Sequence, residues 1–236
     1  MNPINFFTYN IINLLDKHFH QRKIKFHLNK ILKNPRYILD IGAHKGFYTD
    51  LFLKLYSKAE IILFEPNLIL YKKLIIKFNN RKNIKIYNFG IGDKNKYEKF
   101  LTSSVSDYVS TFSIINKNSK YLFIRNLIHG QINQKINYRL IKINKLDTIS
   151  VIKKKKIDLI KIDVEGYEEK VIDGGLKTLN RSKIVLIEHH KDNLYLNYNP
   201  EKIHKKLIQL SFKLYKKIKF PFMTWEDRIY IKDNYL

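Results

Sequence analysis

The feature that most constrains the fold is an alternation between short apolar runs and amphipathic stretches, which begins at Tyr37. Such apolar runs are typical of parallel strands buried on both faces, and the stretches between them have helical spacing. The expected strands are Tyr37–Ile41, Glu60–Phe64, Ile84–Phe89, Ile157–Ile162 and Ile184–Glu188. The expected helices are Phe47–Tyr56, Leu68–Phe78, Glu168–Leu179 and Pro200–Leu210. The pattern predicts a doubly wound, Rossmann-like α/β fold.

Other segments extend or interrupt this alternation. Phe212–Ile218 and Arg228–Lys232, separated by Pro221, predict an antiparallel pair at one edge, which makes the sheet seven-stranded. Tyr97–Ile143 fits the alternation poorly, so we expect it to be an excursion over the strand ends, where a substrate would be held. Ile4–Lys33 has apolar residues at helical spacing and predicts one or two N-terminal helices that form a cap or a dimer surface.

A single domain accounts for the 236 residues, because no internal repeat and no Pro/Gly/Ser-rich linker divides them. We expect residues 1–34 to form a helical cap and residues 35–236 the Rossmann-like catalytic core. The N-terminal sequence lacks a basic segment followed by an uninterrupted apolar run, and no apolar run approaches the roughly 18 residues of a membrane span. We therefore expect a cytoplasmic protein without a membrane span.

The formal net charge of +24 raises the question of a polyanionic partner. The excess is mostly lysine, and it accompanies abundant Ile and Asn with only two alanines, Ala43 and Ala59, which is the bias expected of AT-rich codons. Because the lysines are dispersed along the chain, no nucleic-acid partner is expected. The absence of cysteine excludes disulfides, thiolate metal sites and cysteine nucleophiles.

The first candidate motif joins a strand to a glycine turn: Asp40 lies at the strand end, and Gly42 and Gly46 follow. A carboxylate there can bind a cationic group, and glycines without Cβ let the backbone approach a ligand. A dinucleotide site would use Gly-x-Gly-x-x-Gly to hold pyrophosphate, whereas the spacing here is Asp-x-Gly-x-x-x-Gly. S-adenosylmethionine has an ammonium group and no phosphate, so it suits this motif better. The alternative is a turn that serves only strand–helix packing.

Two further strand ends carry acidic residues. Glu65 follows the second strand, 19 residues after Gly46, and a carboxylate at this position can accept both ribose hydroxyls of an adenosine. The alternative for Glu65 is an acid favoured by the dipole of the next helix. Asp93 ends the turn Gly90–Asp93 and could bind the adenine edge, although this turn alone is typical of a plain loop.

A fourth motif carries a family resemblance. Lys161–Glu168, with the sequence Lys-Ile-Asp-Val-Glu-Gly-Tyr-Glu, and the following Val171–Gly175 resemble the signature of the FkbM methyltransferases. Other segments match the family in order and spacing: Phe64–Asn67, Ser110–Ser113, Leu146–Ile149 and Val185–His190. The resemblance extends from Asp40 to about His190. Lys45 departs from the family, which often has a small or apolar residue there.

The resemblance implies a class I methyltransferase sheet with S-adenosyl-L-methionine as cofactor. It implies that the methionine part is contacted by Asp40, Gly42 and Gly46, the ribose by Glu65, the adenine by Asp93, and that the sulfonium lies beside Asp163. It also implies O-methylation of a small molecule, often a sugar or a polyketide. The expected partner is therefore a small-molecule or glycan acceptor.

The candidate catalytic residues are Asp163, Glu188 and His190, which lie at the ends of the fourth and fifth strands. An acceptor hydroxyl must lose its proton, and a positioned base contributes about 10² to 10⁴ in rate. We expect Asp163 or His190 to be this base. A further hypothesis is that Asp163, Glu188 and one histidine bind a divalent ion such as Mg, Mn or Fe. Since His189 and His190 are adjacent on a strand, they point to opposite faces and at most one can contribute.

Two other functions stay open at this point. The strand–glycine–acid arrangement also fits an NAD-type oxidoreductase, which would be stabilised by NADH and not by S-adenosylhomocysteine. The positive charge also fits a non-catalytic nucleic-acid-binding module on the same fold. The second function is disfavoured because Asp40, Glu65, Asp93 and Asp163 would repel phosphate.

Overall fold

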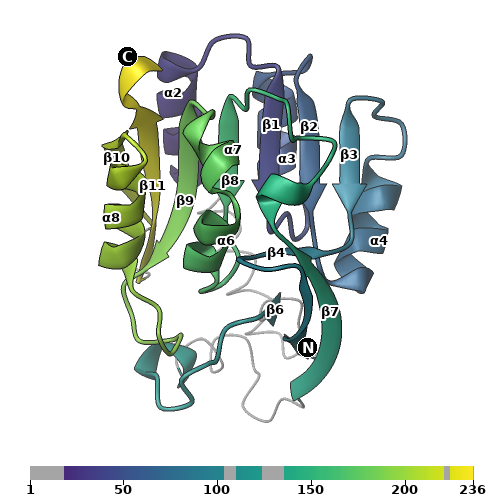
Figure 1. Ribbon diagram of the computed structural model, residues 1–236, viewed down its shortest axis with the longest axis vertical. Coiled ribbons are helices and arrows are strands. Elements are labelled where there is room, and N and C mark those ends of the chain that lie inside the picture. Colours follow the sequence, from purple (N-terminus) through teal and green to yellow (C-terminus); the bar gives the residue numbers. More distant parts are fainter. Residues whose placement is uncertain (1–18, 104–109, 124–135, 221–223, 236) are drawn as a thin grey trace.

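The computed structural model has a seven-stranded central sheet with the order β10-β11-β9-β8-β1-β2-β3 (Figure 1). The strand bounds are β1 Tyr37–Ile41, β2 Glu60–Phe64, β3 Ile84–Tyr87, β8 Leu159–Ile162, β9 Ile184–His190, β10 Phe212–Lys219 and β11 Trp225–Lys232. β3, β2, β1, β8 and β9 are parallel, whereas β11 is antiparallel to both β9 and β10. The structure describes residues 19–103, 110–123, 136–220 and 224–235. The predicted doubly wound sheet with an antiparallel edge pair is confirmed.

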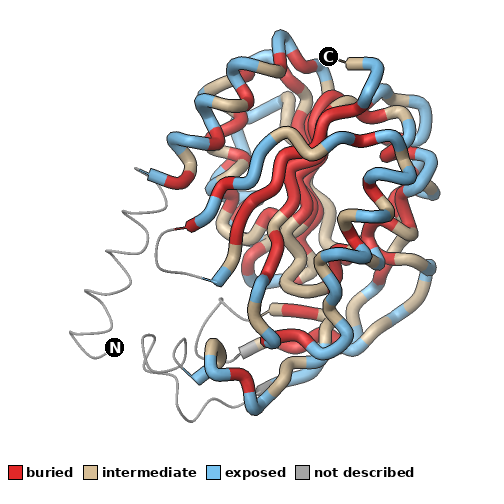
Figure 2. Tube along the Cα trace, turned by 90° about the vertical axis from the view of Figure 1, so that its left-hand side faces the viewer, coloured by how far each residue is buried: buried red, intermediate tan, exposed pale blue. Residues whose placement is uncertain are grey.

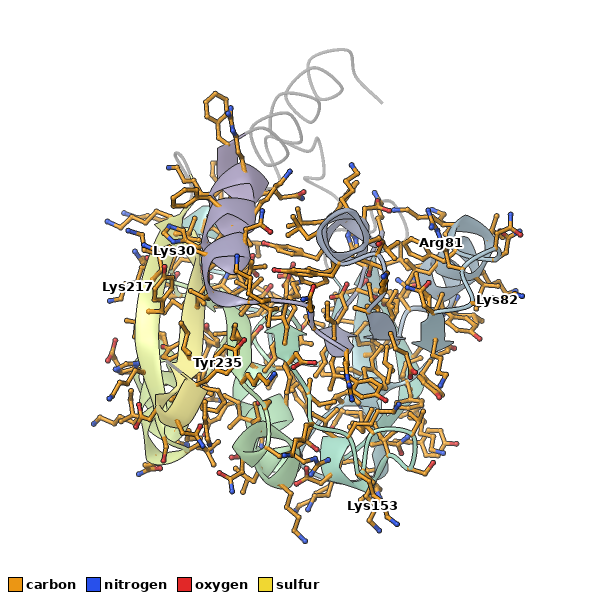
Figure 3. The ribbon with its side chains drawn as sticks, turned by 90° about the horizontal axis from the view of Figure 1, so that it is seen from above. Lys30, Arg81, Lys82, Lys153, Lys217 and Tyr235 are labelled. Carbon is orange, nitrogen blue, oxygen red and sulfur yellow. The ribbon has the colours of Figure 1, made fainter. Side chains whose placement is uncertain are left out.

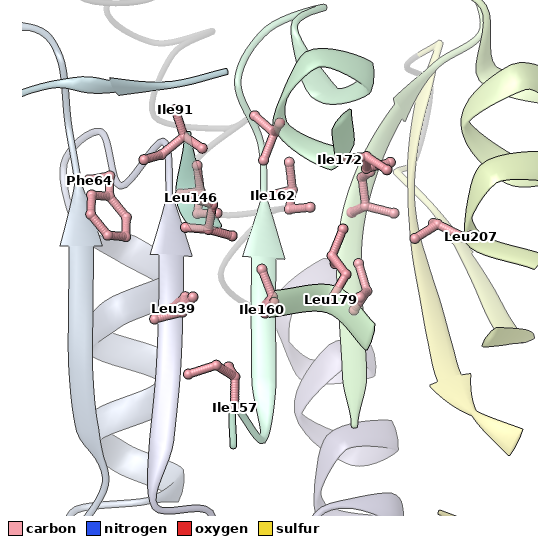
Figure 4. Close-up of a cluster of buried hydrophobic side chains, with 14 of the residues drawn as sticks. Leu39, Phe64, Ile91, Leu146, Ile157, Ile160, Ile162, Ile172, Leu179 and Leu207 are labelled. Atoms are coloured by element: carbon pink, nitrogen blue, oxygen red, sulfur yellow. The ribbon is translucent and has the colours of Figure 1, made fainter. Parts of the chain in front are cut away.

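Helices cover both faces of this sheet. One face is covered by α2 (Gln21–Ile31), α3 (Phe47–Leu55) and α4 (Leu68–Lys77), and the other by α6 (Glu168–Gly174), α7 (Leu176–Asn180) and α8 (Pro200–Gln209). Figure 4 shows the second layer, in which Ile172, Leu179 and Leu207 pack in one cluster with Leu39 and Ile160. The strands lie between the two layers as a continuous buried band (Figure 2).

The expected single helix Glu168–Leu179 is wrong, because two helices occupy this stretch and meet at Gly175. Helix α6 also closely approaches the turn after β4 (Gly90–Ile91). A Cβ built on Gly174 would lie 1.8 Å from the carbonyl oxygen of Gly92. No side chain fits there, so the glycine is required by backbone contact between these two segments.

We expect Gly174→Ala to lower the free energy of unfolding by about 1–3 kcal/mol, the usual cost of overpacking. Its neighbour offers a control with a milder overlap, since a Cβ on Gly175 would be 2.9 Å from Leu146 Cδ2 and 3.2 Å from the backbone oxygen of Val171. Urea unfolding of both variants tests this prediction. Equal losses for Gly174→Ala and Gly175→Ala would contradict the explanation.

The excursion between β3 and β8 contains a second, four-stranded sheet with the order β4-β7-β5-β6. Its longer strands, β5 (Lys96–Ser103) and β7 (Ile136–Asn144), are antiparallel, β4 pairs in parallel with β7, and β6 (Ser110–Thr111) lies at the edge. The strand expected over Ile84–Phe89 is therefore divided, because it ends at Tyr87 and β4 belongs to the second sheet. In Figure 1, β4, β6 and β7 lie beyond the carboxyl ends of β1, β2 and β3. That a substrate is held there stays a prediction.

The N-terminal region is described from residue 19 onward, so most of the predicted N-terminal helical segment lies outside the described residues. Helix α2 packs through Ile24 and Leu28 in the same cluster as α3, as one cover of the sheet. The dimer surface stays a prediction. Among the residues that the structure describes, no helix has the length and apolar character needed to cross a membrane.

Basic side chains are spread over distant parts of the molecule. In Figure 3, Lys30 and Lys217 lie at one side, Arg81 and Lys82 at the opposite side, and Lys153 at a third position. These residues come from different elements, which agrees with the dispersed lysines of the sequence. The labelled residues therefore do not form a single basic stripe.

Candidate active site

Four acidic residues gather at one edge and on one face of the central sheet: Asp40 on β1, Glu65 after β2, Asp163 after β8 and Glu188 on β9. Asp40 lies opposite Lys161 in the register between β1 and β8. Side chains two residues apart on a strand point the same way, so Asp163 shares the face of Asp40, and the registers of β2 and β9 place the other two acids there. These four acids lie at strand ends as expected, and that they form a cofactor and catalytic site stays a prediction.

The glycine turn after β1 has a packing role, which was the alternative expected for this motif. Gly42 and Gly46 have φ values of 82° and 73°, which only glycine adopts at little cost. A Cβ on Gly42 would lie 1.8 Å from the backbone oxygen of Asp163, and one on Gly46 would lie 2.9 Å from Leu74 and Phe78. The space expected to admit a ligand is thus filled by protein at both positions. Ligand contact by the backbone of this turn stays a prediction.

Asp40 is fully buried, and only one of its carboxyl oxygens is bonded. Oδ2 accepts a hydrogen bond of 2.6 Å from the hydroxyl of Thr49 on α3, whereas Oδ1 has no hydrogen-bond partner among the described residues. Burial raises the pKa of Asp40, and the nearby Lys161 opposes this shift. A buried acceptor without a donor is costly, and it is the kind of group that a bound ligand can satisfy.

Glu65 is buried and held by backbone amides. Its Oε2 accepts from His44 N and its Oε1 from Asn67 N, both at 2.8 Å. Burial raises the pKa of Glu65 to about 7, although both amides favour the charged form. The side chain of Asn67 in turn accepts from Ile69 N and Leu70 N and caps α4. Glu65 therefore links the glycine turn after β1 to the start of α4.

Asp163 forms an ion pair with a lysine to which the sequence analysis assigned no role. Lys161 Nζ lies 2.7 Å from Asp163 Oδ2. Burial alone would raise the pKa of Asp163, but the charge of Lys161 and the hydrogen bond that it donates hold this pKa below its ordinary value. The signal that could have identified Lys161 is a single lysine within the apolar strand Leu159–Ile162, since a buried lysine needs a partner.

Glu188 and His190 form a buried ion pair, with Glu188 Oε2 3.1 Å from His190 Nε2. Burial and the charge of Asp163 raise the pKa of Glu188 well above its usual range. Burial would lower the pKa of His190, but Glu188, Glu165 and Glu168 outweigh it and raise that pKa to about 10. At neutral pH His190 is therefore an imidazolium, which has no lone pair to accept a proton. This state argues against His190 as the base.

His189 lies on the opposite face of β9, as the strand geometry predicted. Its ring is fully buried and 6.5 Å from the ring of Tyr230, and neither ring nitrogen has a hydrogen-bond partner among the described residues. Burial and Arg228 lower the pKa of His189 to about 2. At neutral pH His189 is therefore uncharged, and it lies on the face of the sheet opposite the four acids.

The loop after β8 forms one wall of the site. Glu165 has a φ of 55°, its carbonyl accepts a 2.6 Å hydrogen bond from the hydroxyl of Thr111 on β6, and its side chain accepts from the hydroxyl of Tyr195. Glu168 is fully buried and accepts from two backbone amides of the loop, Val164 N and Gly166 N. The sequence analysis assigned no role to these residues. Their contacts join the loop to the second sheet and to the segment after β9.

The proposed metal set is not assembled. Asp163 is paired with Lys161, and Glu188 is paired with His190. Within the described ranges, no group of three or more histidine and acidic side chains has an arrangement that could hold a metal ion. The divalent-ion hypothesis therefore has no structural support.

Asp93 lies in the turn after β4 and contacts α6. Its Oδ2 is 2.9 Å from Lys170 Nζ, and despite partial burial this pairing holds its pKa below the ordinary value. Its interactions thus join it to the second sheet and α6 and not to Asp40 or Glu65. A contact between Asp93 and adenine stays a prediction.

The fold is Rossmann-like. In solved structures, the chain is similar to a protein of the NADB-Rossmann superfamily from Streptococcus agalactiae, with a TM-score of 0.51, 12% identity and coverage of 91% of this chain and 68% of that one. It is also similar to an uncharacterized protein from Listeria monocytogenes, with a TM-score of 0.51, 11% identity and coverage of 89% and 67%. These likenesses concern the fold alone.

The sequence model of the methyltransferase FkbM domain matches residues 40–214, so the chain belongs to the FkbM methyltransferase family. The resemblance found in the sequence is confirmed. The chain is also 26% identical over 182 residues to the 2-O-methyltransferase NoeI of Sinorhizobium fredii, which covers 73% of this chain and 71% of that protein. Family and fold identify an S-adenosylmethionine-dependent methyltransferase.

Proposed function

We propose that this protein transfers a methyl group from S-adenosylmethionine to a hydroxyl oxygen of an uncharged small molecule or sugar. The observation that carries the proposal is the acidic edge, where Asp40, Glu65, Asp163 and Glu188 share one face of the sheet. Asp40 and Glu65 are buried there, whereas Asp163 and Glu188 are partly exposed. The similarity to an enzyme named a 2-O-methyltransferase supports oxygen as the acceptor atom.

The residues of this edge fit the cofactor. Asp40 Oδ1 is a buried acceptor with no donor among the described residues, and an ammonium group would supply one. We assign Glu65 to the ribose hydroxyls, the turn with Gly42 and Gly46 to the methionine part, and Asp93 to the adenine. Bound S-adenosylmethionine supplies an electrophilic methyl group on a cationic sulfur. Asp163, held ionised by Lys161, would favour a positive charge beside it.

Glu188 is the proton acceptor that the electrostatics favour. Burial raises the pKa of Glu188, so its carboxylate takes up a proton more readily than one of ordinary pKa. Asp163 has a lowered pKa and is a weaker base. His190 is already protonated and holds Glu188 in place through their ion pair. We therefore assign proton removal to Glu188, positioning to His190 and electrostatic stabilisation to Asp163.

The proposed acceptor site is rich in carboxylates. Glu165, Glu168 and Glu188 all act electrostatically on the single cation His190. Anionic acceptors, including phosphate-bearing compounds and nucleic acid, would be repelled. Neutral hydroxyl compounds are not, and carboxylates can also accept hydrogen bonds from sugar hydroxyls.

The test is transfer of tritium from methyl-labelled S-adenosylmethionine to a panel of acceptors. The panel contains neutral mono- and oligosaccharides, the same sugars with phosphate groups, amino compounds and RNA. We expect label in the neutral sugars or related hydroxyl compounds, in a linkage stable to base as an ether is. Label in RNA or only in amines would contradict the proposal.

Cofactor affinity is expected to depend on pH through Glu65. Its folded-state pKa of about 7 lies above the ordinary 4.5, so the carboxylate that accepts ribose hydroxyls forms as the pH rises through about 7. Affinity for S-adenosylhomocysteine should therefore increase up to about tenfold per pH unit from pH 5 to 7 and level off above. The raised pKa has the opposite effect on stability: the contribution of Glu65 is fully present below pH 4.5 and is lost as the pH rises through about 7.

Calorimetric titrations across this pH range check the prediction. Glu65→Gln should bind weakly and lose the pH dependence. Glu168→Gln is the matched control, because burial also raises the pKa of Glu168 to about 7 but its carboxylate holds the loop after β8. If Glu168→Gln removes the pH dependence and Glu65→Gln keeps it, the ribose assignment is wrong.

A further inference from the structure

Lys161 is a buried cation in the middle of the catalytic sheet. It is 2% exposed and lies on β8 between Ile160 and Ile162, which are fully buried. Burying an ammonium group without an anionic partner costs several kcal/mol, so the surroundings of Lys161 must compensate for its charge.

The groups that face Lys161 come from several elements. Asp163 Oδ2 lies 2.7 Å from its Nζ, and Asp40 is its register partner across β1. The ring of Tyr48 on α3 lies 4.4 Å from Nζ, an arrangement that favours a cation. Asp227 on β11 adds a third negative charge to its field. Asp227 Oδ2 in turn accepts a 2.5 Å hydrogen bond from the hydroxyl of Tyr48.

Lys161 therefore lies close to both acids that the proposed function assigns to the cofactor, Asp40 and Asp163. Asp163 faces Lys161, Glu188 and His190, and Asp40 faces Lys161, Thr49 and Asp163. Without the lysine, the neighbouring carboxylates of Asp40 and Asp163 would repel each other, and one of them would take up a proton. A protonated carboxyl cannot bind an ammonium group in the same way.

We propose that Lys161 is a positioning residue of the cofactor site, whose ammonium group pairs with Asp163 and places a positive charge beside Asp40, its register partner on β1, without touching the cofactor. The inference rests on the proposed function. It adds a residue on β8 that acts only through its two acidic neighbours. The Nζ is enclosed, with a side chain 3% exposed, so direct contact with a ligand is not part of its role.

Lys161→Met keeps the length and loses the charge, and Lys161→Gln keeps a donor without the charge. We expect both variants to bind S-adenosylhomocysteine at least about tenfold more weakly at pH 7, with affinity partly regained at higher pH as the two acids ionise. Lys161→Arg should restore most of the affinity. Lys85→Met is the matched control: it removes the lysine of a surface pair with Glu60 and should bind as the wild type does.

A second readout needs no cofactor. Lys161 lowers the pKa of Asp163, so this acid stabilises the wild type above its ordinary pKa of 3.8, and the stabilisation is lost as the pH falls through the lower folded-state value. The difference in urea midpoint between wild type and Lys161→Met, or Lys161→Gln if the first variant does not fold, should narrow below pH 4. A role in packing alone would leave that difference independent of pH.

These readouts separate the two proposals. If the wild type binds S-adenosylhomocysteine and the uncharged variants bind it equally well with the same pH profile, the role of Lys161 is wrong and the function stands. If the wild type does not bind the ligand but the stability difference narrows at low pH, the proposed function fails and the ion-pair role stands.

Discussion

Asp40→Asn is expected to weaken the binding of S-adenosylhomocysteine by about 2–5 kcal/mol, the usual loss when one partner of a buried charge pair is removed. The asparagine keeps the shape and can still accept the hydrogen bond from Thr49, but it has no charge for the ammonium group. The apo variant should be at least as stable as the wild type near neutral pH. Burial raises the pKa of Asp40, so ionisation of this carboxyl at higher pH lowers the free energy of unfolding. The uncharged amide of the variant avoids this loss of stability.

Calorimetry and thermal unfolding of the same samples check both parts. Asp50→Asn is the control, because Asp50 is a partly exposed acid that pairs with Lys77. Its affinity should stay within about twofold of the wild type, since exposed ion pairs contribute little. Unchanged affinity in Asp40→Asn would remove this residue from the cofactor site.

Glu188→Gln is expected to lower the rate of methyl transfer by about 10² to 10⁴, the contribution of a positioned base. The amide keeps the size and the contact with His190 but cannot accept the hydroxyl proton. Affinity for S-adenosylhomocysteine should change little, because Glu188 is assigned to the acceptor side. Single-turnover transfer to an acceptor identified by the labelled panel measures the rate.

The control for this variant is Glu169→Gln, in which the lost carboxylate pairs with Lys202 and Lys206 on α8, away from the acidic edge. Its rate should match that of the wild type. If Glu188→Gln keeps the full rate while Asp163→Asn loses it, Asp163 is the base and the assignment must be exchanged.

The central sheet could be predicted because each of its strands has a recognisable local sequence pattern. β1 and β2 have the expected bounds, since each is an apolar run ended by an acid or a turn. The second sheet was missed as a sheet, because β5 and β7 pair across a long stretch of sequence and each alone has only a mixed pattern. The need for glycine at position 174 depends on the distant carbonyl of Gly92, a contact that no local pattern reveals.

The features of the site also divide into those that the sequence could predict and those that it could not. The positions of Asp40, Glu65 and Asp163 follow from strand ends, which a sequence shows. The charge state of His190 depends on Glu188, which is two residues away on the same strand, and also on Glu165 in the loop after β8 and Glu168 at the start of α6, whose approach the local sequence does not reveal. The same holds for Gly42, whose missing Cβ is explained by the backbone of Asp163 and not by a ligand.

Titration calorimetry of the wild-type protein at pH 8 with S-adenosylhomocysteine, and in parallel with NADH, tests most directly that the acidic strand ends form an adenosyl cofactor site. We expect one molecule of S-adenosylhomocysteine to bind per chain, with loss of binding in Asp40→Asn and Glu65→Gln, and no heat from NADH. Absence of binding by S-adenosylhomocysteine, or binding that both variants retain in full, would contradict the assignment.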